Sequence, residues 1–132
     1  EFYDISKEDI KELELLKNTT SSALGSVRYK LKDASVDDTD YKRLLEVFKK
    51  YNVRYFFYNG GNDSMDTCNK ISKYMEKELV LKTMREAGKP IAAGEVATLS
   101  GLDRKVVDKV FAELKKEGAI VSPVRCKWTP AE

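Results

Sequence analysis

Residues 55–71 have the sequence YFFYNGGNDSMDTCNKI, in which a mostly apolar run stops at two glycines and a helical pattern follows at once. This order predicts a buried strand, a tight turn at Gly60 and Gly61, and the start of a helix. Glycine amides and the first turn of a helix bind anions, because backbone N–H groups and the helix dipole point at the ligand. The segment is therefore a candidate phosphate site, in a chain that has no histidine.

The side chains that follow the glycines suit the same ligand. Ser64 and Thr67 place hydroxyls near the positive end of the predicted helix, within reach of phosphate oxygens. Asn62 and Asp63 supply oxygen atoms of the kind that Mg²⁺ takes when it bridges phosphates, so Mg²⁺ is the expected cofactor. The alternative interpretation is an ordinary strand-to-helix turn, with Asp63 or Ser64 as its N-cap.

Two longer strings resemble the phosphofructokinase family, in the pyrophosphate-dependent branch of 6-phosphofructokinases. They are NTTSSALGSVRYKL at residues 18–31 and NVRYFFYNGGNDSMDT at residues 52–67, in the order found in that family. The resemblance covers residues 1–74. It implies an α/β segment of helix, strand, glycine turn and helix that forms the donor-phosphate half of a site for pyrophosphate.

The resemblance also implies a role for individual residues. Arg28 looks like the arginine that contacts the phosphoryl donor, and Gly60 and Gly61 look like the glycines beside the donor phosphates. Asn62 stands where ATP-using members have a magnesium-associated aspartate. Asp63 stands where those members have glycine, and a carboxylate there is associated with pyrophosphate in place of ATP.

Three further family strings are absent from this sequence: an N-terminal glycine loop, a Thr-Ile-Asp loop that supplies the catalytic base, and a Met-Gly-Arg segment for fructose 6-phosphate. Phosphoryl transfer depends mostly on positioning and charge stabilisation, so a donor site without base or acceptor site does not turn over. We therefore predict a catalytically incomplete chain, without fructose 6-phosphate phosphotransferase activity on its own.

A second unit is predicted over residues 75–132. Helical spacing up to Gly88 places Leu79, Val80, Thr83 and Met84 inward. A short helix over 92–99, with Leu99 inward, and a third over 103–117 follow, and then two strands around Pro123. This order resembles the winged helix-turn-helix domains of small prokaryotic regulators. Because no glycine or proline lies between residues 63 and 87, one continuous helix is expected to join the two units in an α+β chain.

Duplex DNA is the partner that a winged helix suggests. Its candidate contacts are the outward cations of the third helix and of the hairpin: Arg104, Lys105, Lys109, Arg125 and Lys127. Residues 75–132 contain 11 lysines and arginines against 9 aspartates and glutamates, which is a weak basic excess for a DNA-binding protein. The alternatives are therefore a DNA-binding regulator with an N-terminal oligomerisation arm, and a winged helix used for packing or protein contacts.

The N-terminal half supplies essentially one strand, and a lone strand leaves its backbone groups without partners. The missing partner would be the segment 26–31, the hairpin or another copy of the chain, so we predict self-association through this half.

Cys68 and Cys126 lack metal-ligand spacing, so no zinc site is expected. No apolar run is long enough to span a bilayer, and the chain is expected to be cytoplasmic, without a membrane partner.

Overall fold

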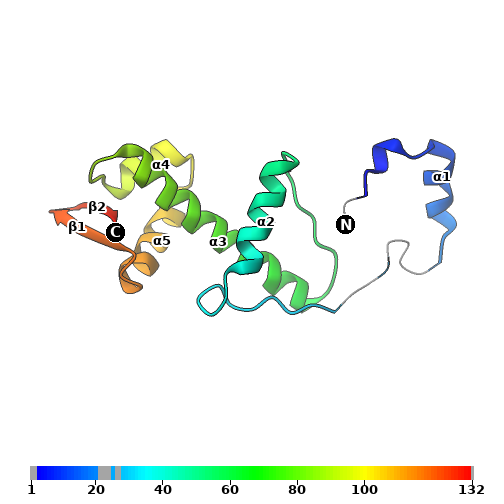
Figure 1. Cartoon of the computed structure of the whole chain (residues 1–132), viewed down its shortest axis with the longest axis horizontal. Helices are drawn as coiled ribbons and strands as arrows, with labels where there is room; N and C mark the ends of the chain where they lie inside the picture. The colour runs from blue at the N-terminus through cyan, green and yellow to red at the C-terminus, as the bar shows by residue number, and fades with distance from the viewer. Residues whose placement is uncertain (1–2, 21–24, 26–27, 132) are drawn as a thin grey trace.

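A computed structural model describes residues 3–20, 25 and 28–131, and it is mostly helical with one C-terminal hairpin (Figure 1). Two short 3₁₀ turns, η1 and η2, flank the first helix. The elements are η1 (Ile5–Lys7), α1 (Ile10–Leu15), η2 (Leu16–Asn18), α2 (Thr39–Lys50), α3 (Asn62–Ala87), α4 (Ala93–Ser100), α5 (Arg104–Lys116), β1 (Ile120–Val124) and β2 (Lys127–Pro130). The α+β class is the one predicted from the sequence.

Helix α3 runs through the centre of the molecule (Figure 1). Its 26 residues span about 39 Å at 1.5 Å per residue. It ends at Gly88, which has φ +62° and a backbone N–H that donates to the Arg85 carbonyl. The predicted continuous helix is therefore confirmed, and it contacts α2 as well as α4, α5 and β2.

The larger core lies around the C-terminal half of α3. Its buried residues come from α3, the loop before α4, α4, α5 and the hairpin: Val80, Met84, Ile91, Val96, Val107, Val110, Phe111, Leu114 and Ile120. Strands β1 and β2 pair antiparallel, and Ile91 forms a separate bridge with Trp128, which packs on the same core. Three helices and a hairpin thus follow one another in the predicted order.

A smaller core lies around the N-terminal half of α3, where Leu31, Tyr41 and Ile71 are buried together. The rings of Tyr41 and Tyr74 are 4.8 Å apart, and the Tyr41 hydroxyl donates to the Lys32 carbonyl at 2.6 Å. This cluster fixes the segment before α2 against α3.

The predicted buried strand at residues 55–58 is wrong. The segment is neither a strand nor buried, and Tyr55 and Phe57 expose 80% and 90% of their surface. Phe56 contacts α2, with its ring 5.2 Å from that of Phe48. The physical reason is that none of the other described residues forms a strand beside this one, so its backbone has no ladder to join.

The hairpin also differs from its prediction. The turn lies at Arg125 and Cys126, and Pro123 belongs to β1, where the register is irregular between Val121 and Val124. Proline has no N–H to donate, so it is tolerated at such a bulge. Cys126 turns the chain with φ +62°.

Two residues predicted to point inward are exposed. Leu79 exposes 37% of its surface and Leu99 exposes 65%, whereas Val80, Thr83 and Met84 are buried as predicted. Leu79 and Val80 are neighbours in α3 and project about 100° apart. Helices α4 and α5 pack on the side of Val80, so Leu79 stays partly exposed.

Candidate functional site

Helix α3 begins directly at the glycine turn. Gly61 is its N-cap, and the Gly61 carbonyl accepts from the backbone N–H groups of Ser64 and Met65 at 3.1 and 3.2 Å. The interpretation with Asp63 or Ser64 as N-cap is therefore wrong. Since glycine has no side chain to cap the helix, its first amides are left to water or to a ligand.

A cavity of about 660 Å³ lies at this helix start, between α3 and the segment that precedes α2. It brings Arg28 together with the first residues of α3, although the two segments lie far apart in the sequence. Its lining consists of Arg28, Tyr29, Lys30, Tyr58, Gly61, Asn62, Asp63, Ser64 and Thr67. Asn62 and Asp63 are exposed, while Ser64 and Thr67 are half-buried.

Gly60 is the one predicted phosphate-site residue that does not line this cavity. It instead packs closely on the helix start: a Cβ added to Gly60 would lie 1.9 Å from Ser64 Oγ and 2.8 Å from Ser64 Cβ. A Cβ added to Gly61 would meet no described atom within 4 Å. The two glycines therefore differ. At Gly60 the backbone lies so close to Ser64 that a side chain would overlap it, whereas Gly61 leaves the cavity open.

Three lining residues were not predicted from the sequence: Tyr29, Lys30 and Tyr58. Tyr29 and Lys30 directly follow Arg28 in the string at residues 18–31, so their position beside Arg28 could have indicated that they line the same cavity. Tyr58 is the last aromatic residue before the glycines. The prediction of a buried strand assigned this side chain to a core instead.

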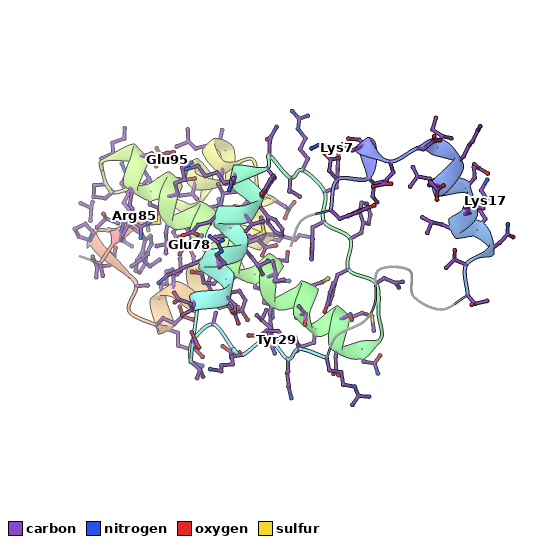
Figure 2. The ribbon with its side chains drawn as sticks, turned by 45° about the vertical axis from the view of Figure 1, so that its right-hand side comes forward. Lys7, Lys17, Tyr29, Glu78, Arg85 and Glu95 are labelled. Carbon is purple, nitrogen blue, oxygen red and sulfur yellow. The ribbon has the colours of Figure 1, made fainter. Side chains whose placement is uncertain are left out.

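The segment that contains Arg28 is held on both sides. Leu31 is buried against α2 and α3, and its carbonyl accepts from Lys70 Nζ of α3 at 3.5 Å. The Tyr29 hydroxyl donates to Asp40 Oδ2 of α2, and this bond raises the pKa of Tyr29. Figure 2 shows Tyr29 beside the helices that hold this segment.

The charges around the cavity favour an anion. Arg28 and Lys30 stand against one carboxylate, Asp63, in the lining. Among the described residues, no group of three or more histidine, cysteine, aspartate or glutamate side chains could hold a metal ion. A Mg²⁺ ion at Asn62 and Asp63 would therefore need the phosphate and water to complete its oxygen ligands, as is common for Mg²⁺ in phosphate sites.

The proposed DNA contacts of α5 lie on different sides of that helix. The Arg104 Nε donates to Asp108 Oδ1 at 2.9 Å, and the guanidinium lies against Gly94 of α4, where an added Cβ would come within 2.8 Å. Lys109 lines a groove between α3 and α5. Arg104 and Lys109 thus face neighbouring helices.

All five candidate DNA contacts are exposed, including Arg104 and Lys109. Lys105 lies in the first turn of α5, where its backbone N–H donates to Asp103 Oδ1 at 2.8 Å. Arg125 lies at the turn of the hairpin and Lys127 begins β2.

No described helix is both long enough and apolar enough to cross a bilayer.

Comparison with known proteins finds relatives for part of the chain. A 74-residue stretch is 51% identical to pyrophosphate–fructose 6-phosphate 1-phosphotransferase of Halomonas elongata and 47% identical to that of Methylococcus capsulatus. A 73-residue stretch is 49% identical to the enzyme of Xanthomonas campestris. The matches cover 56%, 56% and 55% of this chain.

The chain corresponds to 18% of the length of these relatives. No family model matches it, and no solved structure is significantly similar to it. Part of the chain is thus homologous to an internal segment of the pyrophosphate-dependent enzyme.

Proposed function

We propose that the cavity at the start of α3 binds pyrophosphate, as the donor-phosphate half of a phosphofructokinase-type site. The observation that supports this most directly is the cavity lining itself, which joins Arg28 to the residues from Gly61 to Thr67. The names of the related enzymes include pyrophosphate as a substrate of those proteins. Their sequence similarity extends over 56% of this chain.

In this proposal each lining group has one task. The first amides of α3 donate to one phosphate, and the dipole of this long helix adds to their attraction. Arg28 forms bidentate hydrogen bonds with phosphate oxygens, and Lys30 adds a second positive charge. Ser64 and Thr67 donate hydroxyl hydrogen bonds, while Asn62 and Asp63 hold a Mg²⁺ ion that neutralises the bound anion.

The proposed chain binds the phosphoryl donor but does not transfer a phosphoryl group to fructose 6-phosphate. Its sequence lacks the family strings for the base and for the sugar phosphate. The result is a catalytically incomplete hybrid, with a phosphofructokinase-like part over 1–74 and a second part over 75–132.

The test is isothermal titration calorimetry of the full chain with pyrophosphate, with and without Mg²⁺. Arg28→Ala should weaken binding at least about tenfold, since a charge-assisted bidentate contact contributes about 1.5–3 kcal/mol. Arg54→Ala is the matched control, because Arg54 is exposed and lies outside the cavity lining. Equal affinities for the two variants would contradict the proposal, as would the absence of any heat with the unmodified chain.

We propose a second candidate function for residues 75–132, a winged helix that binds duplex DNA. It is supported by the order of three helices and a hairpin, and by the exposure of Lys105, Arg125 and Lys127. Lys105→Ala with Arg125→Ala should reduce affinity for a mixed duplex and lower its salt dependence. Lys89→Ala, which removes an exposed charge from the loop before α4, is the control. A double variant that binds like the control would exclude this surface.

A further inference from the structure

The N-terminal arm, residues 3–18, exposes apolar side chains. None of the residues described over 3–18 is buried, and Ile10, Leu15 and Leu16 expose 76%, 59% and 50% of their surface. Figure 1 shows the arm apart from the remaining helices. Burying these side chains would stabilise any complex, at about 25 cal/mol per Å² of apolar surface.

The arm has one apolar stripe. Helix α1 continues directly into η2, and Ile10, Leu13 and Leu16 follow one another at spacings of three residues. Residues at this spacing lie on one face of a helix, whereas Leu15 falls on a different face, about 100° from its neighbour Leu16. The stripe has the form of an amphipathic helix that packs into a groove.

The body of the molecule contains an apolar groove of about 670 Å³ on α3, between α2 and the loop before α5. Its floor contains Leu45, Met75, Leu79 and Leu102. Met75 and Leu79 expose 40% and 37% of their surface, so no described segment covers them fully. The rim is charged and polar, with Lys49, Ser72, Glu76, Glu78, Lys82 and Arg85.

Charge also matches the arm to the groove. Residues 3–18 contain five carboxylates and three lysines, so the arm is acidic. The rim of the groove has three cations and two carboxylates, so it is basic. Figure 2 shows Lys7 and Lys17 on the arm, apart from Glu78 and Arg85 on the body. Opposite net charges at the edge of an apolar contact favour the correct partner and its orientation.

We propose that two copies of the chain exchange their arms, so that the Ile10–Leu13–Leu16 stripe of each copy packs into the groove of the other. A second copy is favoured over the chain's own arm because the arm projects away from its own body (Figure 1). Reciprocal exchange fills both grooves and closes a two-fold dimer. The groove shares no residue with the lining of the phosphate cavity, so the two proposals stand or fall separately.

The first test is sedimentation velocity of the full chain over a concentration series. Leu16→Asp should raise the dimer dissociation constant at least about tenfold, because it puts a charge into an apolar contact. Leu15→Asp, which makes the same change on another face of the arm, should leave that constant within about twofold of the unmodified chain. A dimer that survives Leu16→Asp, or a chain that stays monomeric throughout, would overturn the proposal.

The second test shows which copy fills the groove. In a background with Cys68→Ser and Cys126→Ser, one tagged copy carries Leu16→Cys and an untagged copy carries Met75→Cys. Oxidation of the mixture should give a disulfide-linked heterodimer of tagged and untagged chains. If both changes in a single chain instead give a cross-link within that chain, at a yield that dilution does not reduce, the arm fills its own groove and the exchange is excluded.

Discussion

Gly60 packs closely against Ser64 at the start of α3, so this position is sensitive to a small change. We expect Gly60→Ala to lower the free energy of unfolding by about 1–3 kcal/mol, because the new methyl group overlaps Ser64 and the helix start must shift. Gly61→Ala meets open space and should cost less than about 1 kcal/mol. Urea unfolding of both variants measures the difference. Equal losses would show that Ser64 moves away without cost.

Asp37 makes stability depend on pH near the start of α2. Hydrogen bonds from Thr39 and the ion pair with Lys32 lower the pKa of Asp37 from its usual 3.8 to about 2. A carboxyl with a lowered pKa stabilises the folded state above its unfolded pKa, and this contribution is lost as pH falls from about 4 to about 2. Asp37→Asn should therefore show a smaller loss of stability over that range. Thermal unfolding at pH 5, 4, 3 and 2 measures it, and parallel curves for the two proteins would contradict it.

At the scale of elements, α3 connects the two cores, and breaking it should separate them. Ser72→Pro introduces a proline into the helix interior, which costs about 3 kcal/mol or more. Circular dichroism should then show an early loss of helix, while the fluorescence of Trp128, the single tryptophan, still reports an intact C-terminal core. Ser72→Ala is the control and should keep both signals in one transition. Coincident transitions in the proline variant would show that the cores do not unfold separately.

The elements that the sequence predicts well are those whose signal is local. In helix α5, Asp103 is the N-cap and apolar residues recur at helical spacing, and four residues at that spacing, Val107, Val110, Phe111 and Leu114, are buried. Residues 55–58 have an equally strong strand composition, but a strand needs a neighbour and none is described beside them. Pro123 predicts a turn, yet the turn forms two residues later. The cavity was predicted only in part, because the family string identifies Arg28 but no spacing rule brings Tyr58 to it.

At the scale of the whole molecule, the exposed aromatic run at residues 55–58 favours aggregation. Tyr55 and Phe57 are exposed in a segment without regular secondary structure, and exposed apolar side chains of this kind favour association with other chains. Tyr55→Lys with Phe57→Lys should suppress species larger than a dimer in light scattering at high concentration. Val36→Lys changes a residue of similar exposure, 78%, in another loop and should have little effect. Large species that persist in the double variant would place their contacts elsewhere.

Because α3 is one uninterrupted helix, the number of residues between its two ends fixes how these ends are rotated relative to each other. Ile71 belongs to one core and Val80 to the other, nine residues apart, which at 100° per residue places them on opposite sides of the helix. Inserting one residue between Lys77 and Val80 would turn one end by about 100° relative to the other and misalign Lys77 with Glu113 and Glu117. In any recombination within this helix, only junctions that preserve its angular register keep both cores intact.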